Sequence, residues 1–278
     1  MPSQKMSPAP YLATGFRNVD GSGDTPACTR CLDLLSDLPF FGEIKQESFR
    51  IIFRARPKIV LDAGCGAGND ICRLATVIPK GRIIGFDASA GLLATAAERI
   101  SHCRERSDLV RGDLLNLPFE SRTFSAIRID RVLQHIHNPA RVIEELVRVL
   151  EPGGTLVAFD NDWDTLSIAM GDMEASAKLT RFWSDSFASG RIGRDLSRIF
   201  RNTGLSGVTV EEKTLTLTDL AIAEKVFDIP GMLDRMKSAR CLTERSAARV
   251  RADLTRTFEE GRFTSGYTGY LAWGKKPE

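Results

Sequence analysis

Several features are missing from this chain of 278 residues, and each absence excludes a class of protein. No apolar run approaches the roughly 20 residues needed to span a bilayer, and the opening MPSQKMSPAPYLATG has no apolar core of a signal peptide. Neither sign of charge dominates, because 38 Lys and Arg are matched by 36 Asp and Glu. No strong field therefore attracts nucleic acid or an anionic membrane. We expect a cytoplasmic protein with neither as a partner.

Cysteine patterns typical of metal sites or disulfide frameworks are also lacking. The six cysteines are scattered, and without an export signal we expect reduced thiols. Only Cys28 and Cys31 have the spacing of a ligand pair, and no second pair or histidine completes a zinc site at a recognisable offset. We therefore expect no metal.

What the chain does contain is an alternation of strand and helix patterns. Residues 1–26 are rich in Pro, Ser, Gly and Asp, and residues 27–56 read as two helices. Further on, the segments that read as strands are KIVLDAG, RIIGFDA, LVRGDLL, FSAIRID and TLVAFDN, followed by 208–218 and 266–274. Helical stretches between the first five predict a parallel sheet with crossover helices. We expect residues 1–56 to form an N-terminal segment and helical cap, and 57–278 the main domain, with a cap insertion at approximately 219–260.

The glycine-rich stretch VLDAGCGAGND, residues 60–70, indicates a ligand-binding turn between a strand and a helix. A dinucleotide turn is G-x-G-x-x-G, whereas Gly64, Gly66 and Gly68 are spaced G-x-G-x-G. Asp62, just before the turn, would repel a pyrophosphate but suits an ammonium or sulfonium group. The Gly-Lys-Ser/Thr of a triphosphate loop is absent too. These residues favour a cationic cofactor without phosphate.

Two further carboxylates follow the next strands. Asp87, in GFDAS, is placed to accept hydrogen bonds from the vicinal hydroxyls of a ribose, a feature shared by dinucleotide and adenosyl cofactors. Asp113, in VRGDLLNLPF, can accept from an exocyclic adenine amine, with the Leu114 amide beside it. The alternative for Asp113 is a helix N-cap or turn residue.

With these motifs the chain resembles a class I S-adenosylmethionine-dependent methyltransferase of the type 11 small-molecule group. The segments that carry the resemblance are VLDAGCGAG, GFDAS, RGDLLNLPFESRTFSAI and RVLQHIHNPARVIEELVRVLEPGGTLV. They extend from Lys58 to about Asp164, and outside this range the resemblance implies only a helical cap and two closing strands.

The resemblance implies an α/β fold with a Rossmann-like, seven-stranded, mostly parallel sheet, whose last strand is antiparallel, with helices on both faces and an added helical cap. It implies S-adenosyl-L-methionine as cofactor and S-adenosyl-L-homocysteine as product. The residues expected to bind the cofactor are Asp62, Gly64, Cys65, Gly66, Gly68, Asp87, Ala88, Asp113, Leu114 and Asp130.

The catalytic residues are less constrained, because transfer from a sulfonium mainly requires alignment of the acceptor. His135 is the best candidate for a base, since an ordinary imidazole titrates near neutral pH; the alternative is a packed histidine. The segment DNDWDTL, residues 160–166, follows the fifth strand and offers Asp162 as a second polar group and Trp163 as an acceptor wall. A polar loop with Trp163 covering the core is equally compatible. Phe182, Trp183 and Phe187 recur at helical spacing, which is more typical of core.

We expect a small-molecule acceptor, by analogy a secondary-metabolite or similar tailoring substrate, and a monomer or homodimer. A catalytically silent S-adenosylmethionine-binding scaffold is the alternative. An RNA methyltransferase is less favoured, because the arginines of residues 240–256 are interspersed with Glu244 and Asp253 and no Asn/Asp-Pro-Pro-aromatic motif is present. The glycine spacing and Asp62 disfavour a nicotinamide oxidoreductase.

The N-terminal segment is a candidate cover for the cofactor cleft. Tyr11 and Phe16 lie in a stretch too polar to fold alone, and such a segment can close over a site and exclude water. We therefore expect Tyr11 and Phe16 to contact the substrate; the alternative is a disordered tail.

Overall fold

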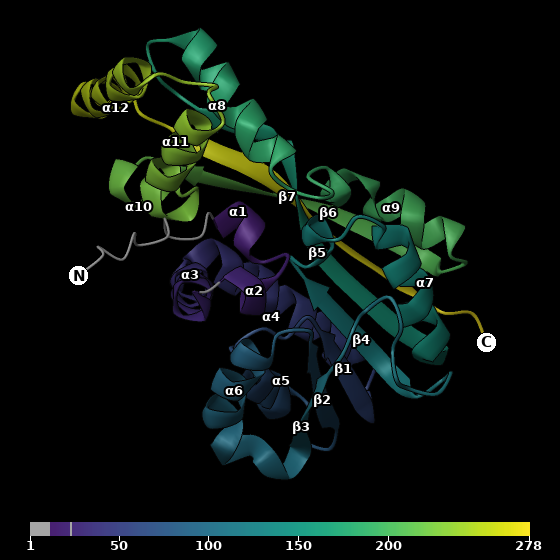
Figure 1. Ribbon diagram of the computed structural model, residues 1–278. Coiled ribbons are helices and arrows are strands. Elements are labelled where there is room, and N and C mark those ends of the chain that lie inside the picture. Colours follow the sequence, from purple (N-terminus) through teal and green to yellow (C-terminus); the bar gives the residue numbers. More distant parts are fainter. Residues whose placement is uncertain (1–11, 23) are drawn as a thin grey trace, which may run out of the picture.

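The computed structural model describes residues 12–22 and 24–278. Seven strands form one sheet in the order β3-β2-β1-β4-β5-β7-β6, in which β7 runs antiparallel to both neighbours (Figure 1). The strands are β1 (Ile59–Ala63), β2 (Arg82–Asp87), β3 (Ser107–Arg111), β4 (Phe124–Asp130), β5 (Leu150–Ile168), β6 (Ser206–Leu217) and β7 (Ser265–Lys275). The expectation of a seven-stranded Rossmann-like sheet with an antiparallel last strand is confirmed.

Helices pack on both faces of this sheet. The α-helices are α1 (Leu12–Gly15), α2 (Val19–Ser22), α3 (Thr25–Asp37), α4 (Pro39–Arg54), α5 (Ile71–Val77), α6 (Ala90–Arg99), α7 (Pro139–Val149), α8 (Met173–Asp185), α9 (Ile192–Asn202), α10 (Leu220–Val226), α11 (Ile229–Ser238) and α12 (Glu244–Glu259), with 3-10 segments at Ile100–Arg106 and Leu133–His135. Apolar side chains of α4 and α5 share a core with one face, and those of α7 and α9 with the other.

Helix α7 illustrates how the local sequence sets these elements. Its start is fixed by Asn138, whose side chain accepts from the Arg141 amide, and by Pro139, whose missing N–H costs nothing at the first helical position. Val142 and Leu146, four residues apart, are buried against the sheet. The helix therefore follows β4 as a crossover and brings the chain back to β5.

The long strand β5 corrects one expectation from the sequence. It has 19 residues and continues through DNDWDTL, with a register shift between Asp162 and Ser167. This segment is therefore part of a strand paired with β7, not a polar loop that follows the strand. The pairing partner is more than 100 residues away in the sequence, so local patterns did not indicate it.

Helices α8, α10, α11 and α12 gather at the end of the sheet where β5, β7 and β6 extend beyond β4 (Figure 1). Phe227, Met232 and Leu254, from the region between α10 and α12, are buried in the same cluster as Trp163. The described residues contain no helix long and apolar enough to cross a membrane.

The cysteine expectation is wrong for one pair. Cys72 of α5 and Cys103 of the following 3-10 segment form a disulfide with an S–S distance of 2.04 Å. Cys28, Cys31, Cys65 and Cys241 are free thiols. The pairing was missed because the two residues are 31 positions apart and come together only when α5 packs beside the 3-10 segment.

Candidate active site

One cavity of about 300 Å³ lies at the carboxyl ends of the central strands. Its walls come from the turn after β1, from the residues at or after the ends of β2, β3 and β4, and from the middle of β5. In open α/β sheets this edge is where ligands bind. The segment joining α1 and α2 contributes Phe16 and Arg17 to the cavity wall.

The turn after β1 requires glycine where the backbone has a positive φ and packs closely against Val132. Gly64 has a φ of 78°, and a Cβ there would lie 2.3 Å from Val132 Cγ2. The Gly66 amide donates to Asp87 Oδ2 at 2.8 Å, and the Ser89 amide donates to Asp87 Oδ1 at 2.9 Å. Burial raises the pKa of Asp87, and these amides oppose that rise. The Asp87 carboxylate is thus held in place at the cavity wall.

Most of the expected cofactor residues are brought together here. Those that border the cavity are Gly64, Gly66, Asp87, Ala88, Asp113, Leu114 and Asp130. Asp62, Cys65 and Gly68 do not border it. Gly68 instead allows close packing, since a Cβ there would lie 2.9 Å from Ala96 Cβ. Asp113 also accepts from the Leu115 amide at 2.9 Å, so the turn role that the sequence left open is present.

Asp62 belongs to a buried ion network that the sequence reasoning missed. Arg128, only 3% exposed, donates to Asp62 Oδ1 at 2.9 Å and to Asp70 Oδ2 at 3.0 Å, and also pairs with Asp130. Lys45 donates to the other oxygen of Asp70 at 2.9 Å. Burial raises the pKa of Asp62 to about 6 although Arg128 opposes the rise. Asp62 therefore does not border the cavity, whereas Asp130, another carboxylate of the same network, does.

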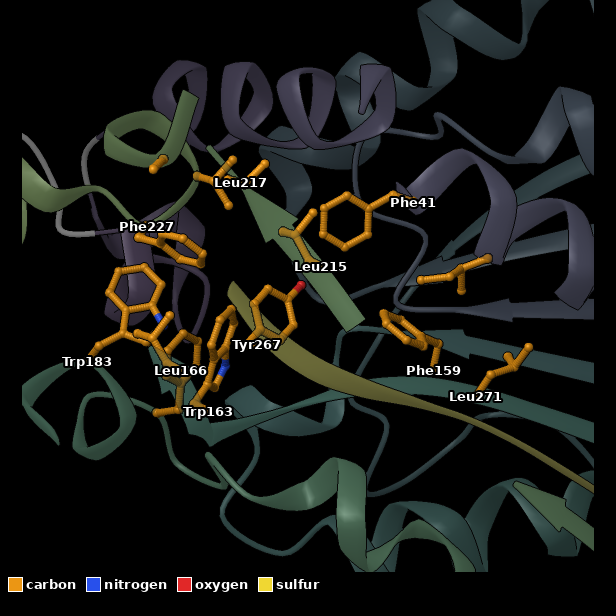
Figure 2. Close-up of a cluster of buried hydrophobic side chains, with 14 of the residues drawn as sticks. Phe41, Phe159, Trp163, Leu166, Trp183, Leu215, Leu217, Phe227, Tyr267 and Leu271 are labelled. Carbon is orange, nitrogen blue, oxygen red and sulfur yellow. The ribbon is translucent and has the colours of Figure 1, made fainter. Parts of the chain in front are cut away.

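Aromatic rings form the other half of the cavity wall. Trp163 stacks on Phe187 at 5.0 Å between ring centroids, and its ring lies 4.4 Å from that of Tyr267. Trp183 meets Trp163 edge to face at 5.4 Å (Figure 2). All four border the cavity. Trp183 and Phe187, which helical spacing assigned to the core, therefore serve both core and cavity, and Tyr267 was not anticipated.

The two expected catalytic residues lie in different places. His135 borders the cavity, with its ring between Phe16 at 5.5 Å and Phe187 at 5.6 Å. Burial, together with the charges of Arg17 and Arg131, lowers the pKa of His135 to about 3. A base of such low pKa takes up a proton poorly at neutral pH.

Asp162 does not border the cavity. Successive side chains of a strand point to opposite faces, and Asn161 and Trp163 take the cavity side of β5. The Asp162 carboxylate, 0% exposed, pairs with Arg194 of α9. Asn161, and not Asp162, is therefore the polar side chain of this part of β5 that borders the cavity.

The N-terminal segment crosses the cavity and is attached on both sides. Arg17 donates to the Ser186 carbonyl oxygen at 2.7 Å, on the side of α8. Asp20 accepts from the Ser89 hydroxyl at 2.6 Å and from the Ala90 amide at 2.9 Å, at the start of α6. Phe16, next to Arg17, borders the cavity, whereas Tyr11 lies outside the described residues.

Comparison with known proteins agrees with this arrangement. Residues 60–154 match the family model described as a methyltransferase domain. The chain is 38% identical over 188 residues to an uncharacterized 37.1 kDa protein in transposon TN4556 of Streptomyces fradiae, a match covering 66% of this chain and 54% of that protein. It is 25% identical over 198 residues to a demethylmenaquinone methyltransferase of Bacillus cytotoxicus, covering 65% of this chain and 84% of the relative.

Among solved structures, the YcgJ protein from Bacillus subtilis superposes with a TM-score of 0.57 at 17% identity, covering 84% of this chain and 99% of that one. This similarity concerns the fold. The matched region spans about half of the Streptomyces relative, as the 54% coverage shows.

The fold, the glycine turn and the strand-end carboxylates define a class I S-adenosylmethionine-binding domain. Residues 60–154 are a methyltransferase domain by the family match, and the chain is similar to the class I S-adenosylmethionine-dependent methyltransferases. Its cofactor is S-adenosylmethionine, converted to S-adenosylhomocysteine. The residues present fit this group, because the Asp87 carboxylate, the open glycine turn and Asp113 border one continuous cavity.

Proposed function

We propose that this protein transfers the methyl group of S-adenosylmethionine to a small molecule with a flat, apolar ring system, bound against Trp163. The observation that carries the proposal is that the cofactor residues and the aromatic wall border the same cavity. Aromatic side chains favour stacked or edge-to-face contacts with other rings. A secondary-metabolite or similar tailoring substrate would satisfy this description.

Each wall has a role in this proposal. Asp87 accepts from the ribose hydroxyls, Asp113 and the Leu114 amide face the adenine, and Asp130 faces the cationic part of the cofactor. The bound cofactor supplies an electrophilic methyl group, so the protein mainly aligns the acceptor and excludes water. We propose that Phe16, which borders the cavity, contributes to that exclusion. We also propose that α10–α12, within the expected insertion, act as the cap.

The relatives and the surface support this choice over its alternatives. The Bacillus relatives are named as demethylmenaquinone methyltransferases, so they act on a quinone. A silent scaffold would have no use for an aromatic cavity beside the cofactor. On α12, Arg256 pairs with Asp253 and Arg251 with Asp234, so these two arginines offer less free positive charge to RNA than the sequence alone suggests. We propose a monomer or homodimer.

The proposal is tested by incubating the protein with trideuteromethyl S-adenosylmethionine and an extract of its source, followed by mass spectrometry. We expect a small molecule that gains one labelled methyl group. An Asp87→Ala variant is the control, because it should lose cofactor binding and therefore the product. Tight binding of S-adenosylhomocysteine without any labelled product would favour the scaffold alternative.

A further inference from the structure

We infer that His135 is a fixed hydrogen-bond donor rather than a base, and that its Nδ1–H group recognises an oxygen of the acceptor, such as a ketone or phenolate oxygen on the ring system. The identity of the bound molecule rests on the proposed function. The position of the proton on His135 is a property of the free protein and is independent of that function.

The side-chain amide of Gln134 has one orientation, which its hydrogen-bond partners fix. An indole nitrogen can only donate, and Trp163 Nε1 lies 2.8 Å from Gln134 Oε1. At the other end, Gln134 Nε2 lies 3.2 Å from the Arg131 carbonyl oxygen, which can only accept. Both partners require the same orientation of the amide, so its oxygen and nitrogen are not interchangeable.

This orientation decides which nitrogen of His135 carries the proton. Gln134 Nε2 lies 3.2 Å from His135 Nε2. Because the amide nitrogen is a donor, His135 Nε2 has to be the acceptor. A neutral imidazole that accepts at one nitrogen carries its hydrogen on the other, so Nδ1 is an N–H group. Protonation of Nε2 would place two donors against each other.

The Nδ1–H group is left with no partner inside the described part of the chain, although the atom is buried. An unsatisfied buried donor is costly, and an oxygen of a bound molecule would remove that cost. The ring lies between Phe16 and Phe187, which both border the cavity. An oxygen of a bound molecule therefore reaches Nδ1 only when these two rings move.

The same hydrogen bonds couple the donor to the aromatic wall. Gln134 joins Trp163 to His135, and its oxygen also accepts from Asn161 Nδ2 at 3.0 Å. The flat wall and the donor are thus held at a fixed separation, which selects a ring system carrying an oxygen at one edge. A protonated amine would be disfavoured, because it has no lone pair for the N–H group. Gln134 is a positioning residue in this arrangement.

The tautomer is measurable in the full-length protein by ¹⁵N NMR of labelled histidine. The chain has three histidines, so a His135→Gln variant assigns the signals of interest. We expect a protonated Nδ1 and an unprotonated Nε2, unchanged between about pH 5.5 and 8 because the site opposes protonation. In Gln134→Glu, a carboxylate facing Nε2 should move the proton to Nε2. An Nε2–H tautomer in the wild type, or a titration near neutral pH, would overturn the inference.

Recognition of oxygen is tested with a matched pair of probes, 1-tetralone and tetralin, on protein saturated with S-adenosylhomocysteine. The ketone should bind about fivefold more tightly, the effect of one ordinary hydrogen bond, and should shift the Nδ1–H signal. In His135→Phe the preference should disappear while tetralin binding remains. Equal binding of both probes, or an unmoved Nδ1–H signal, would overturn the assignment. Absence of methyl transfer to any acceptor would instead count against the proposed function and would leave the tautomer and the ketone preference standing.

Discussion

Asp20, in the segment that covers the cavity, accepts a hydrogen bond of 2.6 Å from the hydroxyl of Ser89, the residue that caps α6. Ser89 also donates its amide to Asp87, the carboxylate assigned to the ribose. The cover and the cofactor wall are therefore joined through one residue. Closure of the cavity and binding of the cofactor should influence each other.

We expect Asp20→Ala to loosen the cover without unfolding the domain. The side chain is exposed and its partners lie at the start of α6. Its loss should speed dissociation of S-adenosylhomocysteine severalfold while the melting temperature stays nearly constant. Stopped-flow measurement of dissociation provides the test, with Asp37→Ala on exposed α3 surface as control. Identical dissociation rates in both variants would show that the cover is not latched by Asp20.

Removal of the ribose-binding carboxylate should weaken cofactor binding strongly. Hydrogen bonds to charged groups contribute about 1.5 to 3 kcal/mol, so Asp87→Ala should raise the Kd for S-adenosylhomocysteine at least about tenfold. Isothermal titration calorimetry measures this, with Asp108→Ala on the far end of β3 as control. An unchanged Kd would remove Asp87 from the site.

The buried Arg128 should be essential for stability. Truncation of one partner in a buried ion network leaves charges uncompensated and typically costs about 3 to 5 kcal/mol. In Arg128→Met, Asp62 and Asp70 would lose the guanidinium while remaining buried. Urea unfolding gives the free energy of unfolding, and Arg82→Met, which removes an exposed pair with Asp108, should cost less than about 1 kcal/mol. Comparable losses in the two variants would contradict a central role for the network.

The pH dependence of stability should carry a contribution from His135. Its pKa in the folded protein is lowered to about 3 from the usual 6.5, so the folded state favours the neutral ring. Below about pH 6.5 the unfolded chain binds a proton that the folded chain does not, and stability is lost as the pH falls toward 3. His135→Gln should reduce this loss relative to the wild type, and exposed His102→Gln should not. Parallel melting-temperature curves for wild type and His135→Gln across that range would refute the buried, neutral state.

A substitution at Trp163 can remove its hydrogen bond to Gln134, which joins it to His135, while keeping an aromatic ring in the cavity wall. Trp163→Phe keeps an aromatic ring but removes the indole N–H that fixes Gln134. We expect the KM for the acceptor to rise severalfold, with the Kd for S-adenosylhomocysteine unchanged. Trp273→Phe, on the strand β7 away from the cavity lining, is the matched control. If Trp163→Phe leaves the KM unaltered, the indole N–H has no role in positioning.

The cofactor half of the site could be predicted from the sequence because its determinants are local. A glycine turn after an apolar strand and a carboxylate at the next strand end form short motifs, and the parallel sheet brings their ends to one edge. Even here Asp62 was misplaced, because its partner Arg128 is on another strand. The only sequence signal for this ion pair was Arg128, a charged residue within the otherwise apolar strand FSAIRID.

The acceptor half of the site could not be predicted from local sequence motifs, because its residues come from segments that are far apart in the chain. Tyr267, on β7, contacts Trp163 only because β5 extends far enough to pair with β7 there. Strand length in the interior of a sheet depends on the partner strand as well as on local residues. The alternation of Asp162 and Trp163 between faces follows from that extension, so the side of each could not be assigned earlier.

A crystal structure of the protein with S-adenosylhomocysteine and the methylated product would show both halves of the site occupied. We expect the product ring against Trp163 inside the cavity, with an oxygen within hydrogen-bonding distance of His135 Nδ1 and the new methyl group facing the sulfur of S-adenosylhomocysteine. A product bound outside this cavity, or with its ring away from Trp163, would contradict this expectation.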